Sequence, residues 1–395
     1  MISSFQPIRR IRLKRFRSLL WADVELTNPL FIVGKNGAGK SNFLKALEFL
    51  ASSMSLPLES VFQLHGGIET VRYRTGSRSR PGNFGIRVDF MLPGDIEGFY
   101  AFEIVSMSGF QFKVVRERCV AGSASFDRDG EQLKITLGGI TPRVIEDALL
   151  LPLLGGTKEF EPVVELLGGI QVFSLEPRLI QELQKPDAGL SLKGDGSNLA
   201  SVLKSLPDAS LERLCQLLGS VVPGVTKVSP VKHGKSLTLK FTQTWQGEDG
   251  GEKESSHEAF AMSDGTMRLV GILGAFLQSA RPSVIALEEP ESTIHPEALS
   301  ALLDLIRGFS RDSQVIVTTH SPDLLDCKWI GPENIRVVTW SEGVTHIKEL
   351  SKAGADTLRQ HLMGAGELMR SEGLRPDDLF DEINPEQTDF FSKIS

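Results

Sequence analysis

The stretch Gly34-Lys35-Asn36-Gly37-Ala38-Gly39-Lys40-Ser41 decides the fold class of this 395-residue chain. It matches G-x-x-x-x-G-K-S, the P-loop, in which glycines allow backbone N–H groups to turn inward toward phosphates. The apolar run 30–33 before it predicts a buried strand, and residues 41–53 after it have the apolar spacing of a helix. Strand, glycine-rich turn and helix in this order are the context that the motif requires. The sequence therefore predicts a nucleoside triphosphate site.

Each position of the motif has an expected role. Lys40 is expected to reach the β- and γ-phosphates, and the hydroxyl of Ser41 is expected to bind Mg²⁺. The start of the helix adds the positive end of its dipole. The remaining cofactor-binding positions that we predict are Gly34, Asn36, Gly37, Ala38, Gly39 and Asn42.

The composition is that of a soluble globular protein with one large domain or two smaller ones, because 41% of the residues are apolar and 24% are charged. No stretch approaches the ~18 apolar residues of a membrane span, and the N-terminus lacks the apolar core of a secretory signal. Cys119, Cys215 and Cys327 are too few and too widely spaced for a disulfide framework or a zinc site. We therefore expect a cytoplasmic protein without a membrane partner.

The net charge of −7 argues against a broadly basic surface for nucleic acid. Basic residues nevertheless gather in segment 9–17, for which we favour the solvated face of an edge strand over a part in nucleotide or DNA binding. The stretch from Pro376 is acidic and predicts a mobile tail. Three apolar residues near its end could dock onto a partner: Phe390, Phe391 and Ile394.

The pattern along the chain predicts an α/β protein. We expect two strands between residues 8 and 35, and an antiparallel meander over 66–140. Residues 157–220 are expected to be mostly helical, and the pattern after 263 alternates helix and strand. The runs that predict the meander are 70–73, 85–90, 100–104 and 110–115, and two later strands are expected at 235–245 and 255–262.

These expectations divide the chain into four parts. Residues 1–150 form an N-terminal lobe with the P-loop and the meander. Residues 151–232 are a helical insertion, and residues 233–350 are a C-terminal lobe with the remaining motifs. Residues 351–395 carry C-terminal helices and the acidic tail.

The second half of the chain supplies three further candidates. The apolar strand 283–290 ends in Glu288 and Glu289, and we expect it beside the P-loop strand, with one carboxylate on Mg²⁺ and the next positioning the attacking water. The strand 314–319 ends at His320, which could sense the γ-phosphate. Ser263 caps a predicted helix over 264–280, whose N-terminus could bind a phosphate.

Taken together, these elements resemble the ABC-type ATPases of the SMC/RecF class, and most closely the OLD-like and RecF-like ATP-binding families. The resemblance spans residues 8 to 326. It rests on five motifs: the Walker A motif at 34–41, the signature motif M-S-D-G-T at 262–266, E-E-P-E-S-T-I-H-P at 288–296, T-H-S-P at 319–322 and the phrase K-R-F-R-S-L at 14–19.

The resemblance implies an ABC-type P-loop NTPase head with an antiparallel β meander and an inserted helical subdomain. It implies ATP and Mg²⁺ as cofactors, with Glu289 and His320 as catalytic residues and Glu288 joining Ser41 on the metal. Ser263 and Gly265 would contact the γ-phosphate held by a second copy. The family's Q-loop glutamine is left unassigned, since Gln63 and Gln171 are both weak candidates.

The functional hypothesis is a Mg²⁺-dependent ATPase that forms a head-to-tail homodimer, or a higher oligomer, around ATP. This dimer would control a separate nuclease-like or toxin-like effector in antiviral defence. The alternatives are a RecF-like DNA-repair ATPase that binds DNA and a scaffold that binds ATP without turnover. A nuclease within the chain is the least favoured, because no D-x-D occurs in the last 75 residues after His320 (395 − 320).

Overall fold

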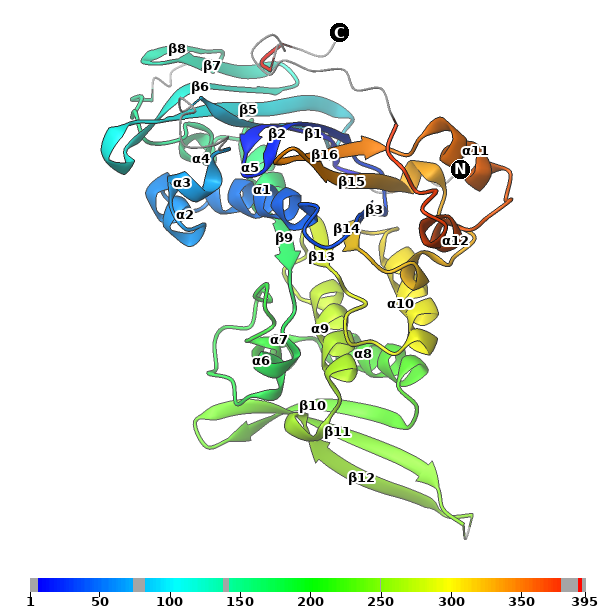
Figure 1. The fold of residues 1–395 in the computed structure, drawn as a ribbon. Coiled ribbons are helices and arrows are strands. Elements are labelled where there is room, and N and C mark those ends of the chain that lie inside the picture. Colours follow the sequence, from blue (N-terminus) through cyan, green and yellow to red (C-terminus); the bar gives the residue numbers. More distant parts are fainter. Residues whose placement is uncertain (1–5, 74–81, 138–141, 249, 378–389, 393–395) are drawn as a thin grey trace.

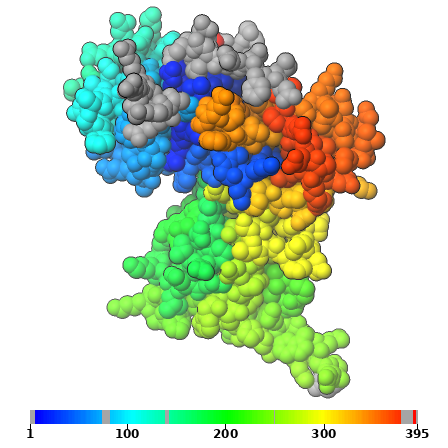
Figure 2. All heavy atoms as spheres, viewed as in Figure 1, coloured from blue at the N-terminus to red at the C-terminus, as the bar shows by residue number. Residues whose placement is uncertain are grey.

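A computed structural model describes residues 6–73, 82–137, 142–248, 250–377 and 390–392. The strands of these residues form three sheets, which Figure 1 shows in two lobes. The signature lobe, residues 177–277, lies below, and the larger P-loop lobe, which contains the two larger sheets, lies above. Figure 2 shows the narrow waist between the lobes and the hairpin that projects from the lower one.

The largest sheet of the P-loop lobe is antiparallel and has the strand order β2-β1-β4-β5-β6-β7-β8. The side chains of one face pack with the helices of the P-loop lobe, and the side chains of the other face point away from that core. The bounds are β1 Ile8–Phe16, β2 Leu19–Glu25, β4 Phe84–Leu92, β5 Ile96–Ser106, β6 Phe112–Ala121, β7 Ala124–Asp129 and β8 Gln132–Ile135.

The second sheet has the order β16-β15-β3-β14-β13-β9, in which the five strands from β15 to β9 are parallel and β16 is antiparallel to β15. The central strands β3 and β13 are buried on both faces, which explains why their sequences are continuous apolar runs rather than alternating ones. The bounds are β3 Leu30–Val33, β9 Ile170–Phe173, β13 Val284–Glu288, β14 Gln314–Thr319, β15 Ile335–Ser341 and β16 Val344–Glu349.

This sheet separates two hydrophobic cores. On one side its side chains pack with helix α1 and the inner face of the antiparallel sheet, and on the other they pack with α9 and α10. The helices of the P-loop lobe are α1 Lys40–Ser53, α2 Leu58–Leu64, α3 Ile68–Val71, α4 Leu151–Leu154, α5 Glu161–Gly168, α10 Pro296–Phe309, α11 Lys352–Arg359 and α12 Ala365–Arg370.

The signature lobe combines helices with a three-stranded antiparallel sheet. Its strands β11 and β12 form the projecting hairpin (Figure 1). The elements are α6 Pro177–Gln181, α7 Leu199–Ser205, α8 Asp208–Val221, β10 Val225–His233, β11 Ser236–Gln246, β12 Glu252–Glu258 and α9 Asp264–Leu277. No helix in the described part of the chain has the length and apolar character needed to span a membrane.

The α/β class, the meander and the alternation after residue 263 are confirmed. The N-terminal region is different, because three strands rather than two precede the P-loop. The phrase at 14–19 covers the end of β1, the turn after it and the first residue of β2, with Arg15 and Arg17 at positive φ. The run 70–73, expected as a strand, ends helix α3 and keeps one bridge from Arg72 to Phe16. Four residues are too few for periodicity to separate helix from strand.

The segment 157–220 is mostly helical, as expected, and it also contains β9, which pairs in parallel with β13. One further expectation was wrong, because sheet pairing is a tertiary property. The strand that ends in Glu288 does not lie beside the P-loop strand β3, since β14 stands between them. Strand β10 was not anticipated.

The basic segment 9–17 does not lie on an edge strand, because β1 pairs with both β2 and β4. Its charges are matched by carboxylates: Arg10 and Arg12 contact Asp23, and Lys14 contacts Glu103 at 2.8 Å. The acidic residues 378–389 and Ile394 lie outside the described residues. Phe390 and Phe391 are buried against this chain's own antiparallel sheet.

Candidate functional site

The P-loop connects the buried strand β3 to helix α1 and adopts the backbone that its glycines permit. Gly37 and Gly39 have φ values of 77° and 102°, which side chains with a Cβ rarely adopt. Helix α1 begins at Lys40, with no side chain capping its first N–H groups. Those groups are therefore available to an anion at the helix N-terminus.

The hairpin β15–β16 supports the P-loop from behind. A Cβ on Gly39 would lie 2.1 Å from Thr345 Oγ1, and one on Gly34 would lie 2.4 Å from the carbonyl oxygen of Val338. The Thr345 hydroxyl donates to the carbonyl of Ala38 at 3.0 Å and lies 2.7 Å from Ser18 Oγ. These contacts explain why both positions are glycine.

Three side chains that are far apart in the sequence meet at one carboxylate. Glu289 Oε1 lies 3.3 Å from Lys40 Nζ and 3.1 Å from His320 Nδ1. Lys40 is buried and also donates to the carbonyls of Gly34, at 2.9 Å, and Lys35, at 3.3 Å. The Lys40, Glu289 and His320 cluster therefore forms at the carboxyl ends of β13 and β14, where ligands of parallel sheets bind.

Glu289 is held in place by its backbone. Its φ of 41° lies in the left-handed region, where a residue other than glycine is strained. Its N–H donates to the carbonyl of Thr318 on the neighbouring strand β14, at 3.0 Å. Glu288 pairs with the same Thr318, so Glu288 and Glu289 lie one after the other at the carboxyl end of β13.

Ser41 and Glu288 are the residues expected on a metal. Ser41 is exposed at the first turn of α1, and Glu288 is half-buried at the end of β13. No cluster of three His, Cys, Asp or Glu that could hold a metal occurs among the described residues. One hydroxyl and one carboxylate suit Mg²⁺, which keeps water and phosphate oxygens as most of its ligands.

The predicted signature motif begins helix α9 in the other lobe. Ser263 is its N-cap and accepts from the N–H of Thr266 at 3.2 Å. A Cβ on Gly265 would lie 2.7 Å from the carbonyl of Thr293, so the loop after Glu289 packs directly on this helix end. In the described residues, the hydrogen bonds of Ser263 stay within its own helix end and do not reach the P-loop.

Three residues near the site were not singled out from the sequence. Glu291 is buried, and its Oε1 accepts from Thr319 Oγ1 at 2.5 Å, directly before His320. Burial raises the pKa of Glu291 and lowers the pKa of Arg268 on α9. Gln181 donates to the carbonyl of Met262 and to Asp264, both at 3.0 Å. Glu291 stands in the E-E-P-E phrase, whereas nothing local pointed to Arg268 or Gln181.

The weak Q-loop candidates have other contacts. The amide of Gln171 donates to Ser191 at 2.7 Å and accepts from Gln278 at 2.9 Å, and Gln63 lies on α2.

Asn42, which was predicted to help bind the nucleotide, has a contact within the protein. Its side chain donates to the Ser18 hydroxyl at 2.6 Å, which links α1 to the turn between β1 and β2.

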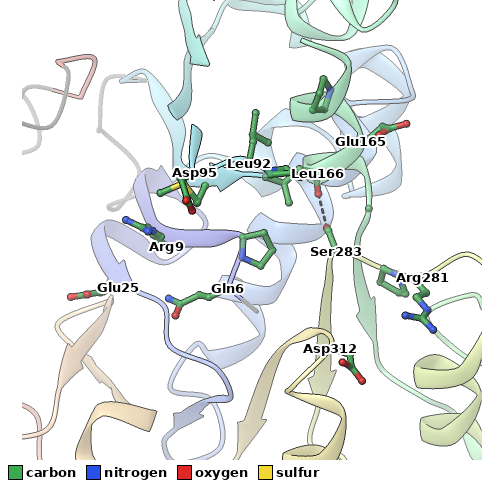
Figure 3. A pocket seen from close by; sticks show the side chains of 16 residues that line it. Gln6, Arg9, Glu25, Leu92, Asp95, Glu165, Leu166, Arg281, Ser283 and Asp312 are labelled. Atoms are coloured by element: carbon green, nitrogen blue, oxygen red, sulfur yellow. Dashed lines mark hydrogen bonds between the residues drawn. The ribbon is translucent and has the colours of Figure 1, made fainter. Parts of the chain in front are cut away.

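Two cavities lie at opposite ends of the parallel strands. A cavity of about 530 Å³ is bordered by P-loop residues 34–38 and by Trp340, Met369 and Arg375. A larger one of about 1170 Å³, shown in Figure 3, lies at the other end, where Ser283 precedes β13 and donates to the carbonyl of Leu166. The larger cavity is remote from the Lys40, Glu289 and His320 cluster.

The fold and the P-loop define the class of this chain, an ATPase head of the ABC type. The family described as "AAA domain, putative AbiEii toxin, Type IV TA system" matches residues 30–102 and 147–326, and the chain belongs to this family. Together with the relative and the solved structures described next, this match confirms the resemblance to the SMC/RecF class and its OLD-like branch.

A curated relative and several solved structures agree with this assignment. The chain is 24% identical over 389 residues to an "OLD nuclease" of Thermus scotoductus, covering 91% of this chain and 68% of that protein. An Smc head domain of Pyrococcus furiosus, solved with the C-terminal domain of ScpA, aligns with a TM-score of 0.54 at 14% identity, over 90% of this chain and 99% of that one.

Another SMC head, solved with the C-winged helix domain of ScpA, aligns with a TM-score of 0.52 at 16% identity, over 89% of this chain and 100% of the other. At such identities these structures establish the fold alone. That fold is the ABC-type P-loop head expected from the sequence.

Proposed function

We propose that the chain is a Mg²⁺-dependent ATPase whose two copies close head to tail around ATP. The observation that carries the proposal is the contact of one carboxylate, Glu289, with both Lys40 and His320. When ATP is bound, Lys40 would turn to the phosphates and Glu289 would be released to position the attacking water. His320 would then sense the γ-phosphate.

The signature helix supports the dimeric part of this proposal. Ser263 and Gly265 lie in the other lobe of the same chain, and the helix N-terminus that they form suits a phosphate. A second copy is the simplest source of a γ-phosphate for it. Ser41 and Glu288 would hold the Mg²⁺ that neutralises phosphate charge in each of the two sites.

We infer that the dimer controls a separate effector in antiviral defence. Support comes from the family description, which names a putative toxin, and from the relative named a nuclease. DNA binding through segment 9–17 is less well supported, because the carboxylates of Asp23 and Glu103 already contact its basic side chains.

The test is the mass of a Glu289→Gln chain in solution with Mg²⁺ and ATP. This variant should keep ATP bound, so light scattering should report a dimer with ATP and a monomer without it. Glu297→Gln, at an exposed carboxylate on α10, is the matched control and should hydrolyse ATP normally. A Glu289→Gln chain that binds ATP and remains a monomer would refute the dimer.

A further inference from the structure

The outer face of the large antiparallel sheet carries an apolar patch among charges. Alternation along β4 and β5 turns Val88 and Phe102 toward the core and Arg87, Phe99 and Ala101 outward. An outward face of an antiparallel sheet is normally wetted and polar. Here Arg87 is only 1% exposed and Phe99 only 4%.

The cover over this patch is the chain's own segment 390–392. Phe390 and Phe391 are each 3% exposed and pack with Phe99, Ala101 and Val120 in a small core of their own. In the described part of the chain, this segment joins no strand of the sheet. It therefore lies on the face rather than extending the edge.

Arginine side chains recognise the backbone of the segment. Arg87 donates to the carbonyl of Phe390 at 3.0 Å and to that of Ser392 at 2.6 Å, and Arg118 donates to that of Phe391 at 3.1 Å. Arg87 is itself fixed by Asp89, at 2.7 Å. Hydrogen bonds to charged donors are stronger than neutral ones, so these contacts define where a peptide backbone runs.

The two rings have separate partners. The Phe390 ring lies 6.0 Å from that of Trp21, and the Arg116 guanidinium lies 4.4 Å from the centre of the Phe391 ring. A Cβ on Gly85 would come within 3.0 Å of the Phe390 ring, so the absence of a side chain there allows its close approach. Ring contacts of this kind add specificity for aromatic side chains.

We propose that this face is a peptide-binding site for two adjacent aromatic residues, and that the tail of the same chain is its resident ligand. The site is formed by Trp21, Arg87, Phe99, Arg116, Arg118 and Val120, and we call it the aromatic-pair site. A ligand tethered to its own site acts at a high effective concentration, which can reach the millimolar range. A competing peptide with the same motif must therefore displace the tail.

The test uses the full chain with the site vacated by the substitutions Phe390→Ala and Phe391→Ala. A fluorescent peptide of residues 387–395 is titrated with this variant and with the wild type, and its anisotropy is followed. The vacated chain should bind the peptide at least about tenfold more tightly, because no tethered tail competes. Phe110→Ala, at an exposed phenylalanine outside the site, should behave as the wild type.

A second substitution tests the receptor side. Arg116→Gln in the vacated chain should weaken peptide binding several-fold, whereas Arg9→Gln, at an exposed arginine of the same sheet, should not. The proposal is overturned if the vacated chain does not bind the peptide, or if the wild type binds it equally well. It is also overturned if the nucleotide-free wild type is a dimer that the two alanine substitutions convert to a monomer, since the tail would then belong to a second copy.

Discussion

We propose that the P-loop lobe and the signature lobe each carry one half of the ATPase site, and these two halves differ in the contacts that they make. In the P-loop lobe, Glu289 is already in contact with Lys40 and His320. In the signature lobe, Ser263 only caps its own helix, and its hydrogen bonds stay local. The side chains of the proposed P-loop half contact one another within the chain, whereas the hydroxyl of Ser263 in the proposed signature half contacts only its own helix end.

This difference indicates which steps would depend on a second copy of the chain and which would not. The P-loop half has fixed backbone and paired charges, so it should bind nucleotide as a monomer. The signature half supplies one helix N-terminus and should affect only steps that follow binding. Substitutions in the two lobes should therefore separate ATP affinity from assembly and turnover.

The largest effect is expected from Lys40→Ala in the P-loop lobe. This change removes the cation that would meet the phosphates, and it should lower ATPase kcat/KM by at least about a hundredfold. Fluorescent ATP binding and phosphate release measure the two parts of the loss. Lys45→Ala on the same helix, where the side chain pairs with Glu48, is the control and should have little effect.

Ser263→Asp should abolish ATP-dependent dimerisation without affecting the P-loop lobe. Aspartate caps a helix as well as serine does, so α9 should stay intact, but its charge would repel a γ-phosphate. We expect unchanged ATP binding by the monomer and loss of ATP-dependent dimers in light scattering. Mixing this variant with Lys40→Ala should restore some turnover, because one site of a mixed dimer keeps both halves. Failure of both results would contradict the assignment of Ser263.

Glu291→Ala should loosen the segment after β14 that carries His320. The change leaves the buried hydroxyl of Thr319 without its carboxylate, at a cost of about 1–3 kcal/mol. Turnover should fall about tenfold while ATP binding is retained, as measured by phosphate release at saturating ATP. Glu291→Gln keeps an acceptor oxygen and should recover most of the rate. Equal losses in both variants would point to overall misfolding instead.

The smallest effect is a pH dependence of stability in the P-loop lobe. Burial lowers the pKa of His65, whose ring lies 5.5 Å from that of Phe49. The folded chain therefore favours neutral His65, and its contribution is complete above the unfolded pKa of about 6.5 and is lost as the pH falls below it. His65→Phe should reduce the change in the midpoint of thermal unfolding between about pH 7 and pH 5. The same change at exposed His257 in the signature lobe should not.

Local patterns predicted the elements that carry the site, and long-range pairing escaped prediction. The P-loop, the strands ending at Glu288 and His320, and the helix capped by Ser263 each have a signal within about ten residues. The position of β14 between β3 and β13 depends on which strands pair, which short apolar runs do not encode. The same reason hid β9 and the role of Gln181.

The C-terminal segment is a second case in which long-range packing escaped prediction. The sequence indicated that Phe390 and Phe391 could dock, but the surface that binds them was expected on a partner. In the structure, the segment packs on outward side chains of four strands, among them Trp21, Arg87 and Arg118. Nothing in the spacing of these residues along the chain marks them as one surface.

The threonine behind the P-loop has a kinetic consequence. Because Thr345 donates a hydrogen bond to the Ala38 carbonyl from the rear, contacts within the protein itself fix the shape of the loop. A loop that is already ordered loses little conformational entropy when a ligand arrives. Nucleotide exchange in the monomer should then be limited by the breaking of phosphate contacts rather than by refolding of the loop. The nucleotide bound to the chain would then adjust rapidly to the ratio of ATP to ADP in the surrounding solution.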